Sequence, residues 1–285
     1  MRSKTARAAA MAAATVVVGA IAITATVPSW AAASHATGSA PTTAAERYDW
    51  GDPLPGPSDE FDYGSADDPA VPDTSKWELA GGGEGQCWEG HAGNGQRCDK
   101  NTRVYGGVLR MTGEANGDSG WLGSTDSRQY GRYEARVRSM NTGDPGDRQY
   151  HPLLLIWPDT DNDWPQDGEY DYLENGAPGE DCAEGYLHYP QDPDADIQQE
   201  HAQDTDCGSP LSEWHTIGFE WTPDHVAGFI DGKEWFKFSG GENDVRKCVQ
   251  CMPIGYQTIQ LDNFYGDGMT PAQYEVDWYR EYAAP

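Results

Sequence analysis

Short runs of alternating apolar and polar residues, separated by turn-forming residues, occur along most of this 285-residue chain. In the run 132–140 (RYEARVRSM), Tyr133, Ala135 and Val137 alternate with charged residues, which is typical of a strand with one face in water. The run 151–158 (HPLLLIWP) is continuously apolar and predicts a buried strand. No stretch has the pattern of a long amphipathic helix. The sequence therefore predicts an all-β fold, a β-sandwich or jelly roll.

Turn residues connect several of these strands directly. The stretch 103–113 (RVYGGVLRMTG) predicts two short strands around a Gly-Gly turn. Residues 215–238 predict a three-stranded meander in which Asp231 and Gly232 form the second turn. The stretch 274–282 (YEVDWYREY) predicts a closing strand.

The N-terminal region has a different composition. Residues 1–33 combine a basic start, an apolar run over 8–27 and small residues, which predicts a secretory signal peptide. A retained transmembrane anchor is the alternative. Residues 34–57 lack periodicity and predict a flexible linker, and residues 58–285 fit one domain. We expect a secreted, extracellular protein that does not associate with membrane after signal cleavage.

The charge is strongly negative. The chain has 19 Lys and Arg against 47 Asp and Glu, a net charge of −28. This charge repels nucleic acid and anionic membranes and disfavours polyanionic substrates, whereas it leaves a neutral polymer unaffected. We expect no nucleic-acid partner, and of polymeric partners we expect a neutral one. We also expect a monomer.

The six cysteines fit an oxidising compartment. A zinc site would need two CxxC pairs or nearby His ligands, and the chain has a single CxxC. Each disulfide in the following set would close a short loop. We predict Cys87–Cys98, Cys182–Cys207 and Cys248–Cys251.

The stretch DGEYDYLENG contains three carboxylates with strand-like spacing. Side chains on a strand alternate between faces, so Glu169 and Asp171 share one face and the intervening tyrosines face the other way. Glu174 is one residue out of step and returns to the acidic face only if a β-bulge lies near Leu173. An accidental spacing on a solvent-exposed acidic strand is the alternative.

Paired carboxylates near tryptophan suit glycoside cleavage. A retaining mechanism needs one carboxylate as nucleophile and a second as acid/base, about 5–5.5 Å apart. Asp171 between Glu169 and Glu174 would help to separate their pKa values. Trp157-Pro158 and Trp164-Pro165 bracket the acidic loop before this strand.

The acidic strand resembles the catalytic strand of glycoside hydrolase family 16, whose bulged members have the same carboxylate spacing after a Trp-Pro pair. Other segments resemble that family in the same order and together cover nearly all of residues 58–285. They are SDEFDY (58–63), SKWEL (75–79), NTRVYGGVLRMTG (101–113), YGRYEARVR (130–138), EWHTIGFEWTPDHVAGFIDGKEW (213–235) and EVDWYREY (275–282).

The resemblance implies a β-jelly roll of two antiparallel sheets with a substrate cleft across the concave sheet, and retaining endo-hydrolysis of a β-glycan. It implies that Glu169 is the nucleophile, Asp171 its assisting carboxylate and Glu174 the acid/base. No cofactor is implied for catalysis.

The resemblance also implies binding residues outside the acidic strand. Trp164 and Trp157 would line the sugar-binding cleft, and His188 would be a cleft histidine, with a packed strand histidine as the alternative. Many members hold a structural calcium ion on the convex face. Asp277, with the backbone near Glu60, is the matching place, although a plain surface carboxylate is the alternative.

This sequence departs from the laminarinase pattern. The region PIGYQTIQLDNFYGDG lacks the usual Gly-Gly-Trp loop, and Tyr170 and Tyr172 replace aliphatic residues. We expect an endo-β-1,3-glucanase, with an agarase-like galactan hydrolase as the enzyme alternative. A glycan-binding module without catalysis is the alternative of another class, and it typically lacks one or both of the glutamates present here.

Overall fold

The computed structural model describes residues 42–160 and 164–285. These residues belong to one compact unit, Pro41–Pro285. The predicted signal peptide 1–33 and the part of the predicted linker before residue 42 lie outside the described residues. Among the helices that the structure describes, none is long and apolar enough to span a membrane.

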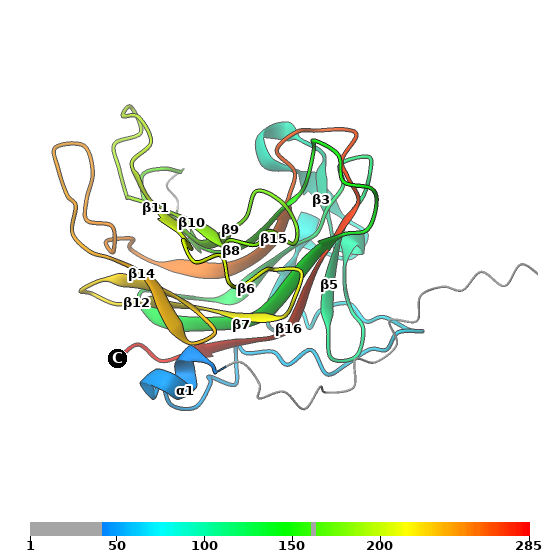
Figure 1. Ribbon diagram of the computed structural model, residues 1–285, viewed down its shortest axis with the longest axis horizontal. Helices are drawn as coiled ribbons and strands as arrows, with labels where there is room; N and C mark the ends of the chain where they lie inside the picture. Colours follow the sequence, from blue (N-terminus) through cyan, green and yellow to red (C-terminus); the bar gives the residue numbers. More distant parts are fainter. Residues whose placement is uncertain (1–41, 161–163) are drawn as a thin grey trace, which may run out of the picture. The chain divides into compact units, whose positions relative to one another are not determined.

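Two seven-stranded antiparallel sheets lie face to face, as the sequence predicts for a sandwich (Figure 1). We call the first the cleft sheet, because it carries the cleft described below. In spatial order its strands are β1 (Trp77–Leu79), β6 (Trp121–Arg128), β15 (Gly255–Asp262), β8 (His151–Pro158), β9 (Glu169–Glu174), β10 (Glu184–His188) and β11 (Gln199–Gln203).

We call the second the outer sheet. In spatial order its strands are β14 (Lys233–Phe238), β13 (Val226–Ile230), β12 (His215–Trp221), β7 (Gly131–Asn141), β16 (Ala272–Tyr282), β5 (Leu109–Gly113) and β4 (Thr102–Val104). The β12–β13–β14 meander and the β4–β5 hairpin confirm the turns predicted from the sequence.

Short elements complete the fold. A two-stranded hairpin consists of β2 (Cys87–Glu89) and β3 (Gln96–Cys98). The helices are α1 (Ala44–Tyr48) and the 3-10 turns η1 (Ala80–Gly82), η2 (His91–Gly93) and η3 (Asp99–Asn101). The described residues are therefore nearly all-β, as predicted.

Aromatic side chains fill much of the space between the sheets. Tyr170 and Tyr172 of β9 point into this core and are fully buried. The Tyr172 ring stacks on Phe219 of β12, with ring centroids 4.9 Å apart and an interplanar angle of 8°. The Tyr172 hydroxyl donates to Gln257 Oε1 at 2.7 Å, so its polar atom is satisfied inside the core. The core therefore fixes which face β9 turns outward.

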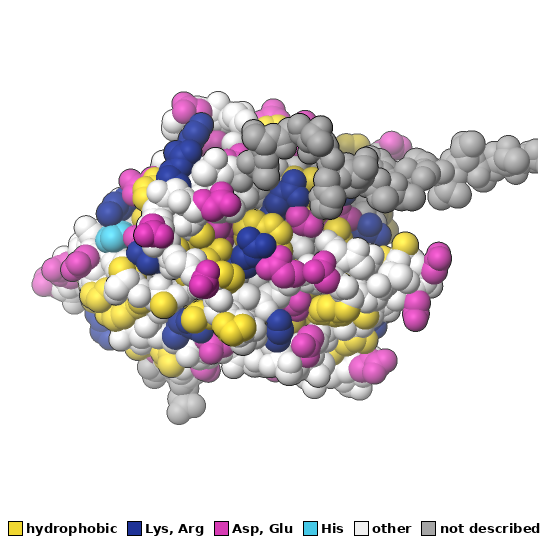
Figure 2. All heavy atoms as spheres, turned by 90° about the horizontal axis from the view of Figure 1, so that it is seen from below, with side chains coloured by type: hydrophobic (Ala, Val, Ile, Leu, Met, Phe, Trp, Pro, Cys, Tyr) yellow, Lys and Arg dark blue, Asp and Glu magenta, His cyan; other side chains and the backbone are white. Residues whose placement is uncertain are grey.

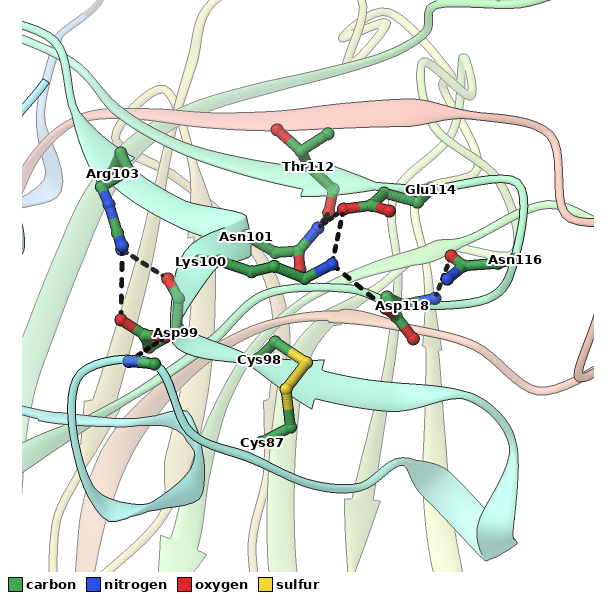
Figure 3. The surroundings of a disulfide bond; sticks show 11 residues. Cys87, Cys98, Asp99, Lys100, Asn101, Arg103, Thr112, Glu114, Asn116 and Asp118 are labelled. Atoms are coloured by element: carbon green, nitrogen blue, oxygen red, sulfur yellow. Dashed lines mark hydrogen bonds and ion pairs between the residues drawn. A yellow bond between two sulfur atoms is a disulfide. The ribbon is translucent and has the colours of Figure 1, made fainter.

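All three predicted disulfides are present: Cys87–Cys98, Cys182–Cys207 and Cys248–Cys251. The first joins the two strands of the β2–β3 hairpin at directly opposed positions (Figure 3). The third lies beside β9, because the Tyr170 hydroxyl donates to Val249 O at 2.7 Å.

The prediction of a flexible linker is wrong for residues 42–57, which pack as part of the compact unit. Ala44, Ala45 and Trp50 are buried against Phe229 and Tyr282 of the outer sheet. Composition did not predict this packing, because two small residues and one tryptophan form no periodic pattern.

Glutamate and threonine side chains hold the N-terminal end of α1. The backbone N–H of Ala44 donates to Glu134 Oε1 at 2.5 Å, and Thr43 Oγ1 caps the helix by accepting from Glu46 N at 3.0 Å. These bonds satisfy donors that a helix start leaves without intrahelical partners.

Acidic and basic side chains are interspersed over the side of the molecule where the outer sheet lies (Figure 2). Ion pairs join many of them, including Arg136 with Asp277 at 2.6 Å and Arg280 with Glu60 at 2.7 Å. On this surface the negative net charge is locally compensated by arginines.

Candidate active site

A β-bulge in β9 brings the three predicted carboxylates onto one face. Leu155 of β8 pairs with Asp171 and Leu154 pairs with Leu173, so Tyr172 is the extra residue without a partner on β8. Tyr172 and Leu173 are both buried in the core, and Glu174 returns to the face of Glu169 and Asp171. The predicted bulge is confirmed, one residue before the expected position.

A cleft of about 820 Å³ lies on this face of the cleft sheet. Its lining comes from β6, β15, β8, β9, β10 and β11, from the β2–β3 hairpin and from neighbouring loops. The residues predicted for catalysis and substrate binding all line it: Glu169, Asp171, Glu174, Trp157, Trp164 and His188. The structure therefore gathers one set of side chains from β8, β9, β10 and the loop before β9.

The pKa values of both Glu169 and Asp171 are strongly raised. Burial and the charge of Asp171 raise the pKa of Glu169 well above its usual range. Burial and the charge of Glu174 raise the pKa of Asp171 in the same way, and Asp171 is 2% exposed. Two buried carboxylates so close cannot both ionise readily, so the pair keeps a proton near neutral pH.

Glu174 has the environment of a general acid. Burial raises its pKa to about 7, the nearby His188 opposes this rise, and the charges of Asp262 and Glu184 add to it. A carboxyl group with this pKa is largely protonated in mildly acidic solution and able to accept a proton again near neutrality. The two ends of β9 thus carry carboxyl groups in different environments.

His188 lies opposite Glu169 in the β9–β10 register. Its Nε2 is 3.4 Å from Asp171 Oδ2, and its ring meets Trp164 edge to face with centroids 5.6 Å apart. Burial lowers the pKa of His188, so the ring is largely neutral at neutral pH. His188 is thus positioned to hold both Asp171 and the Trp164 ring.

Comparison with known proteins shows a shared fold and a likeness to characterised glucanases. No protein-family model matches the chain. A β-glucanase of Rhodothermus marinus is 26% identical over 206 residues, 64% of this chain and 64% of that protein. The chain thus spans just under two thirds of the length of the curated relative that it matches.

Two solved structures are similar over most of the chain. The laminarinase from Rhodothermus marinus has a TM-score of 0.59 and 25% identity, covering 80% of this chain and 96% of that one. A non-specific endo-β-1,3(4)-glucanase from family GH16 has a TM-score of 0.58 and 22% identity, covering 81% of this chain and 98% of that one. The second likeness, taken alone, shows a shared fold. These likenesses agree with the resemblance to glycoside hydrolase family 16 that was drawn from the sequence.

Among the described residues, one group of potential metal ligands is close enough to share an ion. It consists of Glu169, Asp171 and His188, whose ligand atoms lie within 4.8 Å of one another. These are the residues on which the expected acid–base chemistry depends, so we assign no metal to them.

The predicted calcium site at Asp277 and Glu60 does not fit the contacts that these residues make. Asp277 Oδ2 is 2.6 Å from Arg136 Nη1, and Glu60 forms two bonds to the Arg280 guanidinium at 2.7 and 2.8 Å. A guanidinium beside each carboxylate repels a cation and occupies the oxygens that would bind it. We therefore derive nothing from calcium, and the site stays a prediction without structural support.

Several cleft residues were not predicted from the sequence. Tyr256, Thr258, Gln260 and Asp262 line the cleft from alternate positions of β15, and this period of two was the signal that could have found them. Trp88 had no such signal, because its place depends on how the β2–β3 hairpin folds over the sheet.

Proposed function

We propose that this chain is a secreted, retaining endo-β-glucanase with a preference for β-1,3-linked glucan. The observation that carries the proposal is the placement of Glu169, Asp171 and Glu174 on one face of a bulged strand, inside a cleft with tryptophan at its wall. The likeness to a β-glucanase and a laminarinase supports glucan as the substrate.

In the first step, the Glu169 carboxylate attacks the anomeric carbon of the sugar. The bond from that carbon to the glycosidic oxygen breaks as Glu174 gives its proton to the leaving oxygen. Asp171 keeps the proton of the buried pair and donates a hydrogen bond to Glu169, which leaves the nucleophile ionised. Burial raises the pKa of both carboxyl groups, so the pair holds a proton, and the mechanism requires this proton to be on Asp171 when Glu169 attacks.

In the second step, water completes the reaction. Glu174, now a carboxylate, takes a proton from the water, whose oxygen attacks the anomeric carbon and displaces Glu169. Two inversions give net retention. Glu174 must change its protonation state twice in each cycle, and its pKa of about 7 suits both roles.

The charge of the cleft favours a neutral glycan. Among its described lining residues, Arg97 is the single Lys or Arg, and it is engaged with Asp262 at 2.6 Å. Sulfated galactans would meet the carboxylates of β9 without a free cation to bind them. Neutral agarose remains the relevant test of a galactan specificity.

Reducing-sugar assays on laminarin, lichenan, agarose and xyloglucan test the substrate. We expect laminarin to be cleaved fastest. Activity should be kept after chelator treatment, because nucleophile, acid and base are all side chains. Faster cleavage of agarose would replace the glucan assignment.

Glu169→Gln and Glu174→Gln test the roles of the two glutamates. Glu169→Gln should abolish turnover on every substrate. Glu174→Gln should keep much of the first step on aryl glycosides whose leaving group needs no proton, and azide should then rescue it with formation of a β-glycosyl azide. An α-azide, or azide rescue of Glu169→Gln in place of Glu174→Gln, would reverse the assignment, and full activity in both variants would reject a hydrolase.

Secretion rests on residues 1–33 and is tested separately. Expression of the full chain in a secreting host should release into the medium a protein whose N-terminus lies close to residue 34. Recovery of the intact chain in the membrane fraction would favour the anchor.

A further inference from the structure

The β2–β3 hairpin forms one wall of the cleft, at a distance from the catalytic strand. Trp88 and Arg97 face each other across the hairpin, and both line the cleft. The Trp88 ring meets the Trp121 ring of β6 edge to face, with centroids 4.7 Å apart. Three strand spacings separate β6 from β9 in the sheet order, about 14 Å at about 4.8 Å per strand. The wall is thus too far away to touch the reacting bond.

The hairpin is held at its base and along its length. The Cys87–Cys98 disulfide closes the hairpin (Figure 3). The Asp99 carboxylate accepts from Gly85 N, before β2, at 2.9 Å, and it also accepts from the Arg103 guanidinium, after β3. Arg97 forms two bonds to Asp262 of β15, at 2.9 and 2.6 Å, which tie the hairpin to the cleft sheet. Trp88 is therefore presented on a rigid element, which reduces the entropy cost of binding.

Aromatic rings continue from Trp88 along the cleft floor. A Cβ atom at Gly123 of β6 would lie 2.5 Å from Trp121 Cη2 and 3.0 Å from Tyr256 Cε2, so both rings meet above this glycine. Tyr256 in turn pairs across the strands with Trp157 of β8. Trp88, Trp121, Tyr256 and Trp157 form a row from the hairpin to the neighbourhood of β9, which we call the aromatic row.

The aromatic row is uncharged and offers no free cation, although the charges of Glu78 and Asp159 act on Tyr256. Arg97 and Asp262 compensate each other, and the row itself carries no charge. Aromatic faces without a free cation beside them suit the apolar C–H face of a pyranose ring rather than an anionic group. Trp121 is 5% exposed and therefore acts chiefly as the support on which Trp88 rests.

We propose that the aromatic row is a remote glycan subsite in which Trp88 and Tyr256 contact a neutral pyranose several sugar units from the cleavage point, with Trp121 as a positioning residue. This inference rests on the proposed glucanase function. It makes the hairpin a determinant of preferred chain length, because a short substrate held at β9 does not reach Trp88.

Trp88→Ala tests the subsite with laminari-oligosaccharides of three to seven units and with a short aryl glycoside. We expect kcat/KM on the longest chains to fall roughly 2- to 10-fold, the range of one aromatic contact. The trimer and the aryl glycoside should be unaffected. Trp88→Phe should restore most of the loss, because it keeps an aromatic face.

Two further variants separate binding from folding. Trp214→Ala removes a tryptophan that stacks with Arg136 and Arg138 away from the cleft, and it should leave every substrate unaffected. Gly123→Ala inserts a methyl group between Trp121 and Tyr256, and it should reproduce the length-dependent loss with Trp88 intact. Equal kcat/KM for Trp88→Ala and wild type at all lengths, or an equal loss at all lengths, would overturn the subsite.

A binding experiment distinguishes failure of the subsite from failure of the proposed function. Calorimetric titration of Glu169→Gln and of the Glu169→Gln/Trp88→Ala double variant with laminariheptaose and laminaritriose needs no turnover. Weaker binding of the heptaose alone in the double variant supports the subsite, even if wild type cleaves no glucan. Equal heptaose affinity, or no binding by either protein, rejects it.

Discussion

Replacing the buried Glu134 by glutamine should change how stability depends on pH. Glu134 is fully buried under α1, and its Oε1 accepts the Ala44 N–H. Burial raises its pKa from 4.5 to about 7, although the backbone donors of Ala44 and Ala45 oppose the rise. Since the folded state binds this proton more tightly than the unfolded chain does, folding stability falls as pH rises from about 4.5 to about 7.

The size of this effect follows from the pKa difference. At about 1.4 kcal/mol per pKa unit, the rise from 4.5 to about 7 corresponds to about 3 kcal/mol, lost between acid and neutral pH. Glutamine keeps an oxygen acceptor for Ala44 but does not titrate. The stability advantage of wild type at pH 4 over pH 8 should therefore shrink by up to about 3 kcal/mol in Glu134→Gln.

Chemical denaturation with intact disulfides, followed by tryptophan fluorescence from pH 4 to pH 8, measures this difference. About 3 kcal/mol corresponds to a shift of roughly 6–12 °C in Tm for a domain of this size, so thermal melts give an independent readout. Any constant cost of a buried amide cancels, because the comparison is between pH values. The same pH dependence in wild type and variant would show that Glu134 does not titrate as its burial implies.

Three other predictions concern the cleft and its support. In the proposed mechanism Glu174 holds a proton, so kcat/KM should fall as pH rises above about 7. Glu174→Gln should not show this fall on aryl glycosides whose leaving group needs no acid. If the fall persists in the variant, another group causes it. Tyr170→Phe removes a bond to Val249 O at 2.7 Å and one from Met252 N at 3.2 Å, so it should destabilise the fold by about 1–3 kcal/mol in urea titration, and a change near zero would contradict this. Trp164→Ala should raise KM on polysaccharide with little change in Tm, whereas wild-type kinetics would make Trp164 a packing residue.

The sequence predicted the long strands well because their side chains alternate between core and water. Residues 132–140 and 151–158 lie within β7 and β8, respectively. Strands of three residues, such as those of the β2–β3 hairpin, contain too few positions for a period to appear. β15 was missed for a different reason: its cleft residues alternate with Ile259 and Leu261, but the buried Gln257 on the core face leaves only two apolar residues in that series.

In the site, too, residues could be predicted where a local sequence pattern places them and not where their position depends on the packing of distant segments. The three carboxylates could be predicted because they lie within six residues of one strand, and the bulge was the single structural assumption needed. Asp262 could not be predicted to lie near Glu174, because that proximity depends on how β15, β8 and β9 align. To predict that Trp88 lies in the cleft, one would also have to know that the Arg97–Asp262 pair holds the β2–β3 hairpin on β15.

The bulge in β9 also bears on how carboxylate spacing could change during evolution. Deleting Tyr172 would leave Glu169, Asp171 and the last glutamate at strict two-residue spacing, all still on the cleft face. The chemistry would survive, but the core would lose the ring that stacks on Phe219 and the hydroxyl bound to Gln257, at a cost of about 3–5 kcal/mol. Loss of one codon thus converts one spacing into the other, and the cavity that this would leave in the core behind β9 opposes the change.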